Sequence, residues 1–259
     1  MGKIQFEKYQ GTGNDFVIVD NWDGSLDAYA LPVAEICDRR FGVGADGLIV
    51  IQQHDDCDFE MIYFNADGSQ SFCGNGSRCA VRFVHVKNRI SDVTDFLSTD
   101  GMHKATVNGD QIALEMHDVE DWEIGLDHYI TDTGSPHYMV YVDRLEGFPV
   151  VEQARQIRFN DRFSGPGINV NFLENHGDDL SIRTYERGVE NETLSCGTGV
   201  TASAIMHHIR NGAFTGDKEI AVESRGGGLK VSFHFDGNKF TQIKLIGPAE
   251  KTFEGRVDI

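Results

Sequence analysis

The chain has 259 residues, 40% of them hydrophobic and 25% charged, which is typical of a globular protein long enough for two domains. Lys and Arg number 23 and Asp and Glu 41, so the net charge of −18 argues against nucleic acid or an anionic membrane surface as a partner. An odd number of cysteines (five), no signal-peptide pattern and no apolar run of membrane-spanning length lead us to expect a cytoplasmic protein without a disulfide framework.

The first half of the chain combines short strands with two helices. Pro32 near a first turn and Gly42 beyond the last predict a helix at 32–40. Apolar residues at helical spacing predict a second helix at 74–87. Runs of β-branched and aromatic residues predict strands at 16–20, 48–52, 59–64 and 111–116.

The second half repeats this mixture. Helices are predicted at 151–157 and at 198–210, the latter ending at an Asn-Gly pair. His207 and His208 are neighbours on that helix and cannot face one site together, so we expect them on the surface. Strands are predicted at 137–142, 169–173, 180–185, 219–223, 229–235 and 240–246.

Two short segments nearly repeat each other, Cys73-Gly74-Asn75-Gly76 and Cys196-Gly197-Thr198-Gly199, and each opens a predicted helix. Tyr63 precedes the first cysteine by 10 residues, and Tyr185 precedes the second by 11. This near-repeat indicates an internal duplication, with strands wrapped round one helix in each half. The predicted domains are 1–118, completed by a strand at 251–259, and 119–250.

A cysteine at a helix N-terminus lies where backbone N–H groups and the helix dipole lower a thiol pKa. Two such cysteines suit the inversion of a carbon centre, which needs a base on one face and an acid on the other. Their sulfurs would then lie about 6–7 Å apart. The adjacent glycines let backbone N–H groups approach and hold a substrate carboxylate, so the scheme needs neither a metal nor a cofactor.

Further motifs surround the two cysteines, and together they resemble the diaminopimelate epimerase family nearly end to end. The N-terminal half contributes Gly11-Thr12-Gly13-Asn14-Asp15-Phe16, Gly42-Val43-Gly44-Ala45-Asp46-Gly47 and Phe64-Asn65-Ala66-Asp67-Gly68-Ser69, followed by Cys73-Gly74-Asn75-Gly76-Ser77-Arg78-Cys79. The C-terminal half contributes Tyr185-Glu186-Arg187-Gly188-Val189-Glu190, Glu192-Thr193 and Cys196-Gly197-Thr198-Gly199.

The resemblance implies a fold of two similar α+β domains, each a mostly antiparallel strand barrel round a central helix, related by a pseudo-twofold. It implies a cofactor-independent isomerase, usually a homodimer, that interconverts LL- and meso-2,6-diaminoheptanedioate for lysine and peptidoglycan precursor synthesis. Cys73 and Cys196 would transfer the proton, and His137 and Glu186 would tune their pKa values. The implied substrate contacts are Asn14, Asn65, Gly74, Asn75, Asn169, Glu186, Arg187, Gly197 and Thr198.

Two positions depart from the family pattern. Many members have Asn where this chain has Ser135, and some have Gln where it has Gly47. A racemase of another amino acid therefore stays an alternative. A cysteine hydrolase or transferase, with Cys196 as nucleophile and His137 as base, and a binding protein without catalysis are further alternatives.

Overall fold

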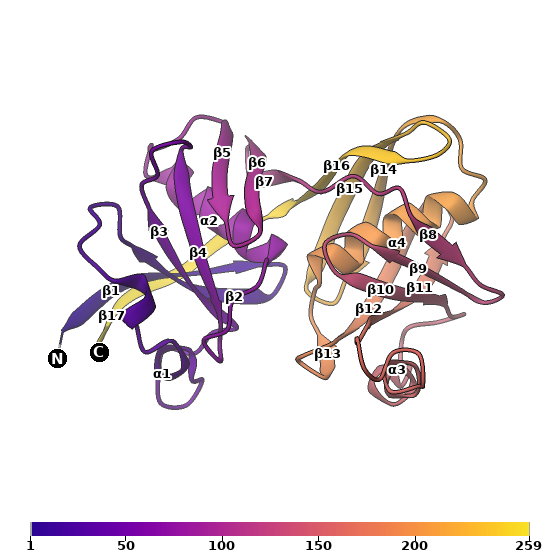
Figure 1. Ribbon diagram of the computed structural model, residues 1–259, viewed down its shortest axis with the longest axis horizontal. Coiled ribbons are helices and arrows are strands. Elements are labelled where there is room, and N and C mark those ends of the chain that lie inside the picture. Colours follow the sequence, from indigo (N-terminus) through magenta and orange to yellow (C-terminus); the bar gives the residue numbers. More distant parts are fainter. Residues whose placement is uncertain (1, 259) are drawn as a thin grey trace. The chain divides into compact units, whose positions relative to one another are not determined.

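Strands dominate the structure, a computed structural model that describes residues 2–258 and divides into two units. The first unit comprises the described residues up to Leu114 and those from Gly247 onward, and the second comprises Glu115–Ile246. Each unit is a mixed α+β structure (Figure 1).

The first unit is a sheet of eight strands in the order β17-β1-β2-β3-β4-β5-β6-β7. The pairs β2–β3 and β4–β5 are parallel and the others are antiparallel. Its elements in chain order are β1 (Lys3–Gly11), β2 (Asn14–Asp20), a 3-10 turn (Ala28–Ala30), α1 (Val33–Cys37), β3 (Gly47–Gln52), β4 (Phe59–Asn65), α2 (Gly74–Val86), β5 (Val93–Ser98), β6 (Gly101–Asn108), β7 (Gln111–Glu115) and β17 (Glu250–Asp258).

The second unit repeats this plan in the order β8-β9-β10-β11-β12-β14-β15-β16. The pairs β10–β11 and β12–β14 are the parallel ones, and the short β13 adds to one end of β12. Its elements are β8 (Trp122–Ile124), β9 (His128–Asp132), β10 (Pro136–Tyr141), α3 (Val150–Arg158), β11 (Asn169–His176), β12 (Asp179–Glu186), β13 (Asn191–Thr193), α4 (Gly197–Arg210), β14 (Gly216–Ser224), β15 (Gly227–Phe235) and β16 (Phe240–Pro248).

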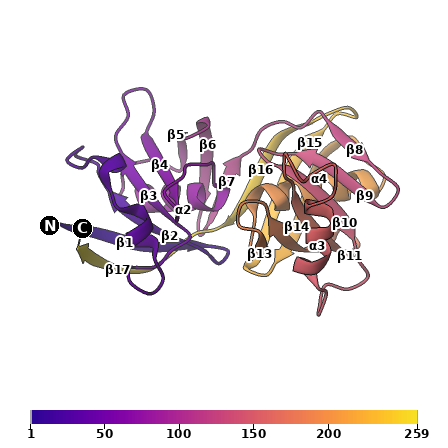
Figure 2. The same cartoon turned by 60° about the horizontal axis from the view of Figure 1, so that its bottom comes forward.

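The helices also fall at matching places. In each unit a small helix, α1 or α3, joins the first parallel pair, and a long helix, α2 or α4, joins the second (Figure 1; α2, α3 and α4 are also labelled in Figure 2). This agreement in order and direction confirms the predicted α+β fold with two similar halves, each wrapped round one helix. Within the described residues the strands form open curved sheets and not closed barrels.

Both faces of each sheet are covered, which explains the unbroken apolar runs at 16–19 and 48–51. On one face of the first sheet, Val17, Val19 and Leu48 pack with α1. On the equivalent face of the second sheet, Val170 and Phe172 pack with α3. The opposite faces enclose α2 and α4, whose first turns carry the two cysteines.

Two predictions were wrong. The helix predicted at 32–40 covers only Val33–Cys37, because the chain folds back and Gly42 lies so close to the Glu35 carbonyl that a Cβ would be 2.0 Å from it. His207 and His208 are buried, not on the surface, because the sheet surrounds α4. Each ring finds a polar partner there, the Gly177 carbonyl for His207 and the Phe214 carbonyl for His208.

Candidate functional site

In the first unit, Cys73 is the N-cap residue of α2. Its extended backbone, with φ −138° and ψ 105°, lets the sulfur accept a hydrogen bond from the Gly76 N–H at 3.4 Å. Gly76 also brings the helix close to the sheet, since a Cβ there would lie 3.4 Å from the side chains of both Ile49 and Met61. The sulfur thus satisfies one of the N–H groups that a helix start leaves unpaired.

Asn14 faces the same sulfur from β2. Its Nδ2 donates to Asp46 Oδ2 at 2.6 Å, and because a carboxylate only accepts, the Asn14 Oδ1 must point the other way. That oxygen lies 3.7 Å from Cys73 Sγ and 3.3 Å from Asn75 Nδ2. Asp46 is itself held by Arg39 at 2.7 Å. The site therefore presents a fixed acceptor to the Cys73 thiol.

The neighbouring carboxylate Asp15 is part of the same support. Burial alone would raise the pKa of Asp15, but hydrogen bonds from Arg39 and Lys8 outweigh it and lower the pKa to about 2. Lys8 Nζ lies 2.5 Å from Asp15 Oδ2 and also donates to the Gly44 carbonyl at 2.6 Å. The loop that carries Asp46 is thereby fixed to β1 and β2.

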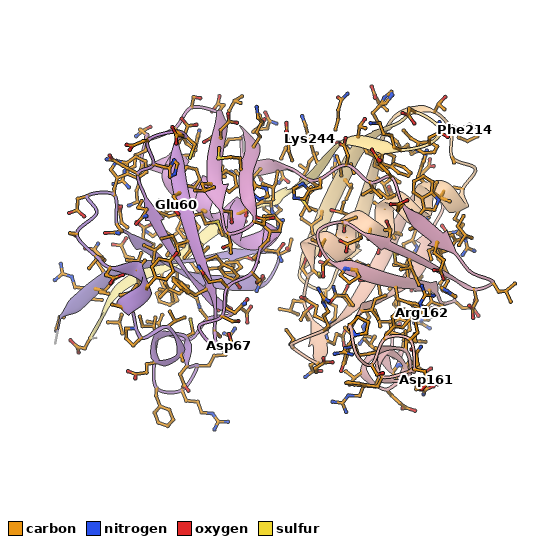
Figure 3. The ribbon with its side chains drawn as sticks, viewed as in Figure 1. Glu60, Asp67, Asp161, Arg162, Phe214 and Lys244 are labelled. Carbon is orange, nitrogen blue, oxygen red and sulfur yellow. The ribbon has the colours of Figure 1, made fainter. Side chains whose placement is uncertain are left out.

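Asn65 ends β4 and braces the loop that leads to Cys73. Its Nδ2 donates to Ser69 Oγ at 3.0 Å, and its Oδ1 accepts from Ser71 Oγ at 3.2 Å. Asp67, labelled in Figure 3, closes the same turn by accepting from the Ser69 N–H at 2.9 Å. Asn14 and Asn75 thus lie beside Cys73 at the start of α2, and Asn65 supports the loop before it. Their contact with a substrate stays a prediction.

In the second unit, Cys196 is the N-cap residue of α4 and is 8% exposed. Its Sγ lies 3.4 Å from Thr198 Oγ1, and that hydroxyl lies 2.9 Å from His137 Nε2. His137 is buried on β10, and burial, followed by the positive charge of Arg187, lowers its pKa to about 3. The ring is therefore neutral at ordinary pH.

Asn171 decides which ring nitrogen of His137 carries the proton. Its Nδ2 donates to the Tyr138 carbonyl at 3.3 Å, and a carbonyl only accepts, so the amide orientation is fixed. The same Nδ2 lies 3.0 Å from His137 Nδ1, which must accept. The proton is then on Nε2 and points at Thr198 Oγ1, which leaves the Thr198 hydroxyl proton for Cys196 Sγ.

Gly199 is required on α4, because there is no room for a side chain between this position and His137 and Asn171. A Cβ on Gly199 would lie 2.7 Å from Asn171 Oδ1 and 3.1 Å from His137 Cε1. Thr184 completes the chain by donating to Asn171 Oδ1 at 2.9 Å. The helix start is therefore packed directly against the groups that set the hydrogen bonding of Cys196.

Asn169, Glu186 and Arg187 lie at the ends of β11 and β12. Asn169 Oδ1 accepts from the Arg187 backbone N–H at 3.0 Å, and Asn169 Nδ2 donates to Ser135 Oγ at 2.8 Å. Ser135 thus orients Asn169, which is the consequence of the first departure from the family pattern. Thr193 Oγ1 donates to Glu186 Oε1.

Sequence reasoning missed two features of these sites, Asn171 and the orienting role of Ser135. Asn171 had a usable signal, because residues two apart in a strand share a face and Asn169 was already a candidate. Tyr63 was noted only for its spacing, which paired it with Tyr185. The one-residue offset places these tyrosines on opposite faces of corresponding strands, and Tyr185 packs on the α3 side.

Residues 2–258 contain neither a metal-ligating cluster nor a membrane-spanning helix. No group of three or more His, Cys, Asp or Glu side chains is arranged to hold a metal ion in this part of the chain. Among the helices described, none is long and apolar enough to cross a membrane.

Comparison with known proteins gives one consistent family. The model of the diaminopimelate epimerase family matches residues 6–121 and 129–252. A diaminopimelate epimerase of Flavobacterium psychrophilum is 45% identical over 258 residues, covering 97% of this chain and 99% of the relative. One from Aquifex aeolicus is 37% identical over 277 residues, covering 98% of each.

Solved structures with little sequence identity share the fold. A phenazine biosynthesis protein of the PhzF family from Bacillus anthracis has a TM-score of 0.80 at 17% identity and covers 100% of both chains. A probable proline racemase from Agrobacterium radiobacter has a TM-score of 0.73 at 14% identity, covering 99% of this chain and 93% of the other.

Proposed function

Because this chain belongs to the diaminopimelate epimerase family of isomerases, we propose that it interconverts LL- and meso-2,6-diaminoheptanedioate. The observation that carries the proposal is the duplicated placement of Cys73 and Cys196, each the N-cap of the long helix in one of two units with the same strand order. Two thiols in equivalent positions suit a reaction that removes a proton from one face of a carbon and adds another to the opposite face.

In the proposed reaction one sulfur, as thiolate, takes the α-proton, and the C–H electron pair passes into the substrate α-carbon and carboxylate. The other sulfur, as thiol, gives its proton to the opposite face. The two sulfurs end with their protonation states exchanged, so each serves as base in one direction. The backbone N–H groups of Gly74 and Asn75 and of Gly197 and Thr198 would bind the carboxylate where negative charge develops.

The other contacts divide by chemistry. Asn14 and the Thr198–His137 pair act on the sulfurs. Asn65, Asn169, Glu186 and Arg187 suit the distal ammonium and carboxylate, because Arg binds a carboxylate with two hydrogen bonds and Glu pairs with an ammonium.

The proposal includes a role in lysine and peptidoglycan precursor synthesis, a cytoplasmic location and a homodimer. Light scattering would measure the mass of the homodimer.

The test is α-proton exchange in deuterated water. We expect deuterium at the α-carbon of diaminopimelate together with inversion, and loss of inversion in Cys73→Ala and in Cys196→Ala. Exchange with a different amino acid alone would support a racemase of that amino acid. Acylation of Cys196, with hydrolysis that Cys73→Ala leaves unchanged, would support a hydrolase. Binding of an amino acid without proton exchange would support a binding protein without catalysis.

A further inference from the structure

Glu190 closes the turn at 186–190, which leaves β12 and carries Arg187. Its backbone N–H donates to the Glu186 carbonyl at 2.8 Å, and its Oε1 accepts from the Gly188 N–H at 3.2 Å. The φ angle of Glu190 is +54°, in the left-handed region that glycine adopts more easily than any other residue. The chain therefore keeps a strained residue at this position, and its carboxylate is what a glycine could not supply.

The carboxylate of Glu190 also anchors the turn to the body of the second unit. Its Oε1 accepts from Arg158 Nη2 at 2.9 Å, and its Oε2 accepts from the hydroxyl of the buried Tyr185 at 3.0 Å. Arg158 ends α3, which packs against β11, β12 and β13 (Figure 1). Arg158 is itself fixed, because its Nη1 donates to the Phe163 carbonyl at 3.0 Å. Glu190 thus connects the turn with α3 and with β12.

Arg187 and Arg158 both lie over Gly167. A Cβ on Gly167 would be 3.2 Å from Arg187 Cδ and 3.3 Å from Arg158 Nη2. Two cations so placed repel each other unless a negative charge is present. Burial alone would raise the pKa of Glu190, but the hydrogen bonds that it accepts and the charge of Arg158 outweigh burial and lower this pKa. Glu190 is therefore ionised at neutral pH and compensates the charge of Arg158.

Arg187 is held by its backbone N–H and by one nitrogen of its guanidinium. The N–H donates to Asn169 Oδ1 at 3.0 Å, and Nη1 donates to the Pro166 carbonyl at 3.2 Å. Among residues 2–258 no other acceptor contacts this guanidinium, and Arg187 is exposed. The side chain is thus restrained while its remaining N–H groups are free to bind a carboxylate.

We propose that Glu190 is a positioning residue for Arg187 and, through it, determines the specificity of the site for a substrate with a second carboxylate. Paired with Arg158, Glu190 holds the turn at 186–190 so that the Arg187 guanidinium is ready to bind that carboxylate. This role rests on the proposed function, in which Arg187 contacts the distal end of diaminopimelate. Glu190 acts on binding and leaves the proton transfer at the other end of the substrate unchanged.

The experiment compares diaminopimelate with lysine, which has the same amino-acid end and the same distal ammonium but no distal carboxylate. Two variants remove the carboxylate of Glu190. Glu190→Gln keeps the size of the side chain, and Glu190→Gly suits the φ of +54° and so preserves the turn. In both we expect KM for diaminopimelate to rise about tenfold while kcat changes less than about threefold. The inhibition constant of lysine should stay as in the parent.

The matched control is a second pair of an arginine and a carboxylate in the same unit. Glu123 accepts from both terminal nitrogens of Arg162, labelled in Figure 3, at 2.7 Å each. Glu123→Gln removes the same charge but does not touch the turn at 186–190, so KM and the inhibition constant should stay as in the parent. Arg158→Lys, which lacks the fork that binds Glu190, should raise KM as Glu190→Gln does, and the double variant should show little further rise.

Three results overturn the proposal: an unchanged KM in Glu190→Gln or Glu190→Gly, an equal rise in the inhibition constant of lysine, or the same change in Glu123→Gln. Failure of the proposed function is distinguishable, because the parent would then not invert diaminopimelate. Amide hydrogen exchange of the turn, measured without substrate, should be about tenfold faster in Glu190→Gln. An unchanged exchange rate overturns the anchoring by Glu190 whichever substrate the protein uses.

Discussion

The burial of His137 makes stability depend on pH, and His137→Gln is the perturbation that measures this dependence. Its folded-state pKa of about 3 lies below the ordinary 6.5, so between these values the unfolded chain binds a proton that the folded chain does not. Stability therefore falls as pH drops through this window. pH 5 lies about 1.5 units below the pKa of a histidine in the unfolded chain. At about 1.36 kcal/mol per unit, this difference lowers the free energy of unfolding by about 2 kcal/mol.

The assay is urea unfolding at pH 7 and pH 5, followed by fluorescence of Trp122 in a Trp22→Phe background, so that only the unit with His137 is observed. We expect the parent to lose about 2 kcal/mol more than His137→Gln between the two pH values. His176→Gln, at an exposed position, should behave as the parent does. Equal losses in the parent and in His137→Gln would refute the argument, as would an NMR titration of the His137 ring near pH 6.5.

Two further predictions concern buried polar groups. Asn171→Asp should raise the pKa of His137 by more than about two units, because a carboxylate beside the ring favours imidazolium. In the neutral ring the proton should move to Nδ1. Nitrogen-detected NMR measures both the pKa and the position of the proton, and Asn175→Asp is the exposed control on the same strand. Arg78→Met should stabilise the first unit by about 1–3 kcal/mol in urea unfolding, since burial lowers the arginine pKa to about 10 and Nε and Nη1 have no hydrogen-bond partners among residues 2–258. A destabilised variant would contradict this.

The parts of the fold that local pattern determines were predictable. The apolar runs of β2 and β3, the glycine-rich starts of α2 and α4 and the resemblance of the two halves all follow from short stretches of sequence. The strands β1, β5 and β6 were not predicted, since none of them is an unbroken run of β-branched and aromatic residues. The pairing of β1 with β17 joins segments from the two ends of the sequence, which a local pattern does not contain.

The same distinction holds at the candidate sites. The cysteines and their glycines were found from the sequence, because helix starts have a local signature. The tautomer of His137 could not be found, since it depends on Asn171 and on the Tyr138 carbonyl, which are placed by parallel pairing of β10 and β11. His207 and His208 were wrongly predicted to lie on the surface for a related reason. Their adjacency on a helix does not reveal that a sheet encloses that helix.

The buried His137 has a consequence for the pH dependence of turnover. Its pKa is lowered to about 3, so the ring stays neutral and does not change charge between pH 5 and 9. Under the proposed reaction both limbs of the kcat/KM profile in that range therefore belong to the two thiols. A limb near pH 6.5 that disappears in His137→Gln would contradict this assignment.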